Sequence, residues 1–256
     1  MLSVRVVKLG GNEIDRPEWL GACARALAAI GPVVIVHGGG RAVSALSRRL
    51  GLPVEQRDGL RVTTPEVAAV VELVLGGPVN RQVVAALRVA GLDAVGLSGV
   101  DGGLLTARPA EGGQLGHVGD IVAVRAALLE SLLLAGLTPV IAPMAPDAAA
   151  PTAAPLNVNA DDAAAAVAGA LRAAELLFVS DVPGVLIDGE KQPTLEAGEI
   201  ETLIELGAAA GGMAAKLRAA TAALRAGARA VRIGDLHLLD DARSGTRILA
   251  AAPQPA

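Results

Sequence analysis

Two lysines of this chain lie in glycine-rich turns. Only three of its 22 basic side chains are lysines, and the other 19 are arginines. Lys8 precedes Gly10-Gly11, Lys216 follows Gly211-Gly212, and Lys191 lies in a polar stretch. An ammonium is a compact point charge, and backbone N–H groups in such turns bind phosphate. The pattern therefore indicates phosphoryl transfer, although a general preference for arginine would also leave a few scattered lysines.

Composition limits the classes of protein to which the chain can belong. Its 256 residues suffice for one large domain or two small lobes, and a net charge of -4 argues against a general nucleic-acid binder. Aromatic residues make up only 1%, so the core must be built from Ala, Val, Leu and Ile. Cys23 is the single cysteine, which excludes internal disulfides. Apolar runs are interrupted before about 18 residues and no leader pattern is seen, so we expect a cytoplasmic protein without a membrane span.

Short apolar segments alternate with helical patterns along the chain. Strands are predicted at 3–9, 32–37, 92–98, 137–142, 175–180 and 229–233, and helices at 17–30, 41–50, 65–75, 78–90, 121–135, 161–173 and 212–226. We expect a hairpin at 103–118 and a loop at 144–155. Such alternation predicts an α/β fold with a mainly parallel sheet covered on both faces. Ligands bind beyond the carboxyl ends of such strands, where Lys8, Gly38–Gly40 and Asp181 fall.

Several common signatures are missing from this sequence. No lysine lies in the G-x-x-x-x-G-K-[ST] pattern of a P-loop. The turn at Gly38 has Val43 where a dinucleotide fingerprint requires its third glycine. The three histidines, His37, His117 and His237, show no metal-ligand spacing, so we expect them to have structural roles.

A set of glycine-rich and polar segments remains. The segments are K-L-G-G at 8–11, H-G-G-G at 37–40, G-L-R-V-T at 59–63, G-L-S-G at 96–99, G-H-V-G at 116–119, N-V-N-A-D at 157–161, S-D-V-P-G at 180–184, G-G-M at 211–213 and G-T-R-I at 245–248. In this order they resemble the amino acid kinase family, and within it the kinases of N-acetylglutamate. One segment alone would be weak evidence, whereas the ordered set covers nearly the whole chain.

The resemblance implies a fold and an activity. The fold would be a three-layer αβα sandwich with an open, mainly parallel sheet, divided into an acyl-substrate lobe (1–174) and a nucleotide-binding lobe (175–256). The activity would be transfer of the γ-phosphoryl group of ATP to the side-chain carboxylate of N-acetyl-L-glutamate, an early step of arginine biosynthesis, with Mg2+ bridging the phosphates. Because that carboxylate is already ionised at neutral pH, the reaction needs no general base.

The resemblance also implies roles for individual residues. Lys8 and Lys216 would contact the transferring phosphoryl group from opposite lobes, and Asp161 would hold both ammonium groups in place. Backbone N–H groups of Gly10, Gly11, Gly39 and Gly40 would meet phosphoryl and carboxylate oxygens, while Arg61 and Asn157 would bind the acyl substrate. The nucleotide would lie against Asp181, Val182, Pro183, Gly184, Val185, Leu186, Ala208, Ala209, Ala210 and Gly211.

Some of these interpretations have alternatives. Arg61 could be a surface residue, Asp161 could be only a helix N-cap, and the use of Asn159 is open. The acceptor could instead be glutamate or 2-aminoadipate attached to a small acidic carrier protein. A third reading is a binding module of the same fold without catalysis, although Lys8, Asp161 and Lys216 are all present.

The beginning of the chain bears on its expected assembly. Relatives inhibited by arginine carry an extra N-terminal helix that joins dimers into a ring, and only seven residues precede Lys8. We therefore expect a homodimer that arginine does not inhibit, with no nucleic-acid or membrane partner. The Ala/Pro-rich run that includes Pro155 leaves the shape of the neighbouring substrate loop open.

Overall fold

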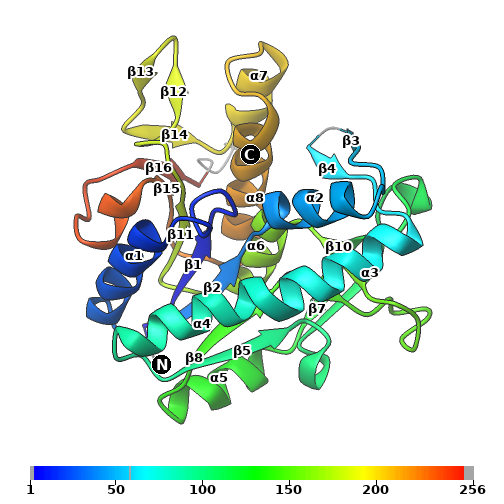
Figure 1. Ribbon diagram of the computed structural model, residues 1–256. Coiled ribbons are helices and arrows are strands. Elements are labelled where there is room, and N and C mark those ends of the chain that lie inside the picture. The colour runs from blue at the N-terminus through cyan, green and yellow to red at the C-terminus, as the bar shows by residue number, and fades with distance from the viewer. Residues whose placement is uncertain (1–2, 58, 251–256) are drawn as a thin grey trace.

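An eight-stranded sheet forms the middle of the molecule (Figure 1). The computed structural model describes residues 3–57 and 59–250. In spatial order the strands are β14 (Thr194–Glu196), β16 (Thr246–Leu249), β15 (Val231–Gly234), β11 (Glu175–Val179), β1 (Arg5–Leu9), β2 (Val33–His37), β8 (Thr138–Ala142) and β5 (Ala94–Ser98). Every neighbouring pair is parallel except β15–β16. The predicted mainly parallel sheet is confirmed.

Helices cover both faces of this sheet. On one face are α5 (Ala126–Leu134), α6 (Ala160–Ala170) and α8 (Gly211–Ala226); on the other are α1 (Pro17–Ala29), α3 (Pro65–Val74) and α4 (Asn80–Val89). Side chains of a strand alternate between faces, so Val6 joins the core under α6 whereas Val7 joins the core under α1. Three layers result, as predicted.

Smaller elements extend the sandwich. A second sheet has the order β6 (Leu105–Pro109), β7 (Val118–Val124), β10 (Leu156–Val158) and β9 (Met144–Ala145). Two hairpins are β3 (Gln56–Arg57) with β4 (Leu60–Arg61), and β12 (Leu186–Ile187) with β13 (Glu190–Lys191). The remaining helices are α2 (Gly40–Arg49) and α7 (Ile200–Glu205), with short turns at Asp101–Gly103, Ala110–Gly113 and Leu236–Leu239.

The region from 103 to 135 differs from its prediction. The hairpin pairs β6 with β7, so its second strand runs to Val124 and α5 begins at Ala126 instead of 121. The segment 121–124 is rich in β-branched residues, and pairing with β6 fixes it as strand. A helical pattern read from the sequence therefore began five residues too early.

The segment Pro65–Val89 is the one part of the described chain whose length and composition would suit a membrane span. It is interrupted by the irregular turn Leu75–Val79, where Gly77 has non-helical angles and Pro78 lacks an N–H. Val71 and Leu87 are buried against the strands. These contacts are those of a helix in the core of a sandwich. Such core helices are also long and apolar enough to meet the criteria for a membrane span.

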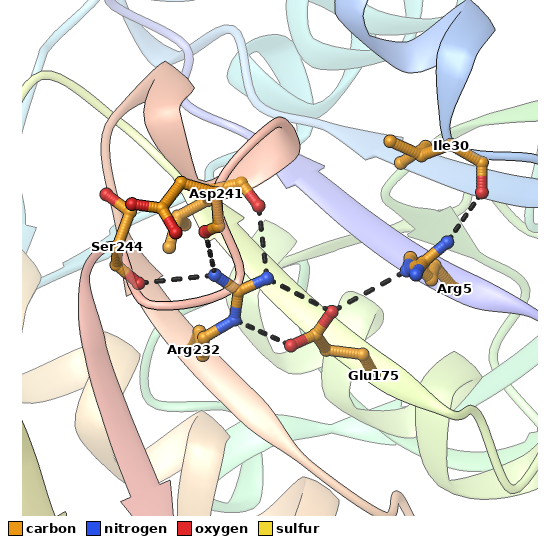
Figure 2. A network of polar contacts seen from close by, with 7 residues as sticks. Arg5, Ile30, Glu175, Arg232, Asp241 and Ser244 are labelled. Atoms are coloured by element: carbon orange, nitrogen blue, oxygen red, sulfur yellow. Dashed lines mark hydrogen bonds and ion pairs between the residues drawn. The ribbon is translucent and has the colours of Figure 1, made fainter.

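A partly buried ion network joins the amino ends of three strands (Figure 2). Arg232 on β15 donates hydrogen bonds to both carboxylate oxygens of Glu175 on β11, and to the carbonyls of Leu238, Asp241 and Ser244. Arg5 on β1 approaches the same carboxylate at 3.6 Å. Because Glu175 and Arg5 are the first residues of their strands, the network lies at the opposite end from the carboxyl termini of the strands.

Candidate active site

Lys8 and Asp161 form a buried ion pair at the carboxyl end of β1. The Lys8 Nζ lies 2.8 Å from Asp161 Oδ1. Each residue is 6% exposed. Lys8 shares the face of Val6 because side chains alternate, and α6 covers that face and carries Asp161 in its first turn. Burial of an ammonium is tolerated here because a carboxylate compensates its charge.

Asn159 is the residue that caps α6. Its Oδ1 accepts the backbone N–H of Asp161 at 2.8 Å. The alternative that Asp161 caps this helix is therefore wrong, and its carboxylate is left to face Lys8. The N-cap role of Asn159 follows the usual preference for Asn at this position.

Lys216 reaches the same region from the first turns of α8. Its Nζ is half-buried and makes one long hydrogen bond, 3.4 Å, to the carbonyl of Gly212. Burial lowers the pKa of Lys216, as does the nearby charge of Lys8, whereas Asp161, Glu13 and Asp181 raise it. The predicted catalytic residues are thus brought together in one electrostatic cluster.

The two glycine turns touch each other through their backbones. A Cβ on Gly11 would lie 2.4 Å from the nitrogen of Gly39, and a Cβ on Gly38 would lie 2.9 Å from the nitrogen of Gly11. A Cβ on Gly39 would come within 2.5 Å of Leu75, and Gly39 also has a φ of 157°. Only glycine fits these positions. Their backbone N–H groups, next to the amino end of α2, form a surface suited to anions.

A cavity of about 150 Å³ adjoins the second turn. Gly38, Gly39, Gly40, Arg61 and Asn157 all line it. Its lining combines these polar groups with apolar side chains such as Val71 and Leu75, as is common in small-molecule sites.

Arg61 presents one unpaired edge of its guanidinium in this region. Its Nη2 donates to the carbonyl of Gly40 at 2.9 Å and to Ser44 Oγ at 2.8 Å, while its Nη1 is buried without a hydrogen-bond partner among the described residues. Burial and the charge of Arg48 lower the pKa of Arg61. Such a cation fits a carboxylate, which would take up the remaining donor. Arg61 is therefore not a solvated surface residue.

Asn157 also lines this cavity. Its Nδ2 donates to Thr63 Oγ1 at 3.2 Å. The hydroxyl of Thr63 in turn donates to the carbonyl of Arg61 at 2.8 Å. This chain of hydrogen bonds joins the segments 59–63 and 157–161, which the sequence singled out separately.

The segments predicted to bind nucleotide occupy two places. Ala209, Ala210 and Gly211 line a cavity of about 450 Å³ together with Leu60, whereas Ala208 is half-buried beside them. None of the residues 181–186 lines either of these two cavities among the described residues. Asp181 instead belongs with the lysines, since its charge acts on both Lys216 and Glu13.

The loop 182–186 is held by Thr246. The Val185 N–H donates to Thr246 Oγ1 at 2.8 Å, and a Cβ on Gly184 would lie 2.7 Å from the same oxygen. Val185 is fully buried, whereas Val182 and Pro183 are not and Leu186 is 41% exposed. Thr246 belongs to the segment 245–248 singled out in the sequence. The contact shows that one function of this segment is to hold the loop 182–186 in place.

Glu13 is a site residue that the sequence interpretation missed. It is 3% exposed, and a Cβ on Gly10 would lie 1.9 Å from its Oε2. Burial raises the pKa of Glu13, with a smaller contribution from Asp181, whereas Lys8 and Lys216 lower it. In the sequence, its position just after the first glycine turn is the feature that could have identified Glu13 as a site residue.

A model of the amino acid kinase family matches residues 3–235. The chain belongs to this family. Among curated relatives, the acetylglutamate kinase of Chloroflexus aurantiacus is 48% identical over 250 residues, 96% of this chain and 97% of the relative. The acetylglutamate kinase of Geobacillus kaustophilus is 49% identical over 222 residues, 86% of this chain and 84% of the relative.

A solved structure shares the fold of this chain. The crystal structure of smu.665 from Streptococcus mutans UA159 superposes with a TM-score of 0.84 at 28% identity, covering 97% of this chain and 99% of the other. Both the family and the fold expected from the ordered segments are confirmed.

Proposed function

We propose that this chain transfers the γ-phosphoryl group of ATP to the side-chain carboxylate of N-acetyl-L-glutamate, giving N-acetyl-L-glutamyl 5-phosphate for arginine biosynthesis. The observation that carries the proposal is the cavity that Arg61, Asn157 and the second glycine turn line together, with the Arg61 Nη1 left without a hydrogen-bond partner among the described residues. The two curated relatives, both acetylglutamate kinases over nearly their full length, support the same reaction.

The chemistry is an in-line displacement at phosphorus. A carboxylate oxygen of the acceptor forms a bond to the γ-phosphorus, and the bond from that phosphorus to the β,γ-bridging oxygen breaks. The electron pair leaves with ADP, and no proton moves because the nucleophile is already an anion. Positioning and charge stabilisation therefore account for most of the catalysis.

The roles of the charged residues follow from that requirement. Lys8 and Lys216 would stabilise charge on the transferring phosphoryl group from two sides. Asp161 would keep Lys8 in place through the 2.8 Å ion pair, and it acts on Lys216 electrostatically. Burial and the charge of Lys8 lower the pKa of Lys216, and the phosphates of ATP would place anionic charge next to its ammonium.

The backbone and neutral groups would position the reactants. Amides of Gly10 and Gly11 would meet phosphate oxygens, and those of Gly39 and Gly40 would meet the acceptor carboxylate and the phosphoryl group. Arg61 would pair with the α-carboxylate of N-acetylglutamate, with Asn157 binding the same molecule. The segments 181–186 and 208–211 would hold the nucleotide.

Mg2+ fits this site as an ion held mainly by the nucleotide. No group of three His, Cys, Asp or Glu side chains in the described parts of the chain could hold a metal alone. Mg2+ in kinases is bound by one or two carboxylates together with substrate phosphates. Asp181 is the protein carboxylate that would face it, and the ion would neutralise charge on the phosphates.

A coupled hydroxamate assay tests the function directly. With ATP and Mg2+, we expect acyl phosphate from N-acetylglutamate, and none from glutamate or from glutamate on a carrier protein. Turnover only with the carrier-bound acceptor would show that the chain is a kinase of carrier-bound glutamate instead. Absence of turnover with all three acceptors would refute it.

We further propose a cytoplasmic homodimer that arginine does not inhibit, with the lobe boundary near residue 174. Exposed apolar side chains on the long helical segment, Leu73 at 62% and Val89 at 91%, support association of two copies. Light scattering should give twice the 25.5 kDa mass. A monomer, or inhibition by sub-millimolar arginine, would contradict the proposal.

A further inference from the structure

His37 sits beneath the second glycine turn and is completely buried. It is the last residue of β2, and its Nδ1 lies 2.7 Å from the carbonyl oxygen of Gly38. Its Nε2 lies 3.1 Å from Nδ2 of Asn80 at the start of α4. Asn80 is itself 1% exposed. Two buried polar side chains therefore support the backbone that lines the acyl cavity.

The hydrogen bonds fix which ring nitrogen carries the proton. The Asn80 Nδ2 also donates to the carbonyl of Val140 at 3.0 Å, so the amide nitrogen, not the oxygen, faces this cluster. His37 Nε2 must then accept, and Nδ1 must donate to the carbonyl of Gly38. Burial lowers the pKa of His37 to about 4, partly offset by the Gly38 carbonyl, so the ring stays neutral at physiological pH.

The direction of the Gly38 carbonyl determines the direction of the next amide. In a trans peptide the N–H of residue i+1 points opposite to the C=O of residue i. Holding the Gly38 oxygen against the core therefore turns the Gly39 N–H away from the core. The Gly39 nitrogen is where a Cβ on Gly11 would collide, at 2.4 Å, so this amide lies between the two turns.

Glycine makes this support necessary. Gly38 and Gly39 have no side chains to anchor them, and glycine has more backbone freedom than any other residue. The Gly38 N–H donates to the carbonyl of Leu9 at 3.0 Å, which fixes the peptide unit between His37 and Gly38. The next unit, between Gly38 and Gly39, is held by the imidazole through the Gly38 carbonyl.

We infer that His37 and Asn80 are positioning residues for phosphoryl transfer: Asn80 sets the tautomer of His37, and the Nδ1–H of His37 aims the Gly39 amide at the reacting groups. The inference rests on the proposed function and extends it to two buried residues that touch no substrate. It assigns His37 more than the purely structural role expected from the sequence.

A matched pair of variants separates positioning from packing. In His37→Asn the amide nitrogen can occupy the δ position and donate to the Gly38 carbonyl, although the contact with Asn80 is lost. In His37→Gln the amide reaches the ε position and keeps a partner in Asn80, but no donor remains for Gly38. Leu27→Ala, a fully buried change in the same core on α1, serves as a destabilised control.

Steady-state kinetics and the NMR resonance of the Gly39 amide are two independent measurements of this positioning. We expect kcat of His37→Gln to fall about 10-fold to 100-fold with a smaller change in KM for ATP, and kcat of His37→Asn and Leu27→Ala to stay within about 3-fold of wild type. In 15N-labelled protein, the Gly39 amide resonance should move further from its wild-type position in His37→Gln than in His37→Asn.

The outcomes distinguish this inference from the proposed function. If wild type transfers no phosphoryl group, the function fails, whereas the Gly39 resonance still tests the positioning. If both variants shift that resonance equally, or if kcat of His37→Gln stays as close to wild type as kcat of Leu27→Ala does, the inference is overturned.

Discussion

The Nζ of Lys8 lies 2.8 Å from Oδ1 of Asp161, and both side chains are almost completely buried. A strand and the first turn of a helix hold the two groups, and Asn159 caps that helix without using the carboxylate. The position of the ammonium is thus fixed before any nucleotide binds.

Replacing Lys8 by arginine should lower kcat by at least about 100-fold, although the charge is kept. The guanidinium is broad and planar, and it cannot place its charge where a compact ammonium lies between Asp161 and the glycine turn. Steady-state kinetics with N-acetylglutamate measures the effect. Lys191→Arg, an exposed change, is the control and should behave as wild type. Near-normal kcat in Lys8→Arg would refute the role given to Lys8.

Asp161→Asn should impair both stability and turnover. The change is nearly isosteric but leaves a buried ammonium without its anion, which typically costs about 3 kcal/mol or more. Denaturant unfolding should show that loss, and kcat should fall because Lys8 is no longer held. A variant as stable and as active as wild type would mean that the pair has no organising function.

Arg61→Lys should raise KM for N-acetylglutamate about 10-fold while leaving KM for ATP unchanged. Arg61 already uses one nitrogen for Gly40 and Ser44, and a lysine cannot present a second donor to a carboxylate. Initial-rate kinetics with each substrate varied in turn tests this. Arg49→Lys, at an exposed position nearby, should change neither KM. Equal effects on both substrates would place Arg61 outside the acyl site.

The stability that the neutral His37 ring contributes should be lost as the pH falls from about 6.5 to about 4. The pKa of His37 is lowered from 6.5 to about 4 in the folded state, so between these values the unfolded chain binds a proton that the folded chain excludes. This one group corresponds to a loss of about 3 kcal/mol at the acid end of the window. Urea unfolding at several pH values measures the slope. His37→Gln should have a smaller slope, and an unchanged slope would contradict the neutral buried ring.

Glu175→Ala should destabilise the fold without altering kcat. Arg232 would remain buried, at 7% exposure, without its carboxylate, and such losses are about 3 kcal/mol. The network lies at the amino ends of the strands, remote from Lys8. Thermal unfolding and the hydroxamate assay on the same preparation separate the two effects. A fall in kcat at temperatures where the variant is fully folded would show coupling across the sheet.

The sequence predicts the sheet and the lysine cluster well for one reason. The central strands are continuous apolar runs, and the glycine turns follow them immediately, so periodicity alone locates Lys8 and Gly38–Gly40 at the same edge. The sequence pattern predicts helix for 121–124, the end of strand β7, because only pairing with β6 decides the conformation of these residues. Very short elements such as β14 and α7 have too few residues to show a period.

Residues whose importance depends on distant neighbours could not be found this way. Glu13 and Asn80 look like ordinary polar residues until folding brings them under a turn. The N-cap function of Asn159 was open in the sequence because Asp161 offers the same chemistry two residues later.

The pairing of β1 with β11 has a consequence for how the protein is made. Arg5 to Leu9 pair with Glu175 to Val179, so the strand that carries Lys8 is synthesised long before one of its two neighbours. Such distant contacts slow folding because a long loop must close first. A ribosome-bound chain that ends before residue 175 would hold β1 as an open sheet edge, exposed to pairing with other chains. We expect this protein to depend most on chaperones during synthesis, when its first 174 residues have been made and β11 has not.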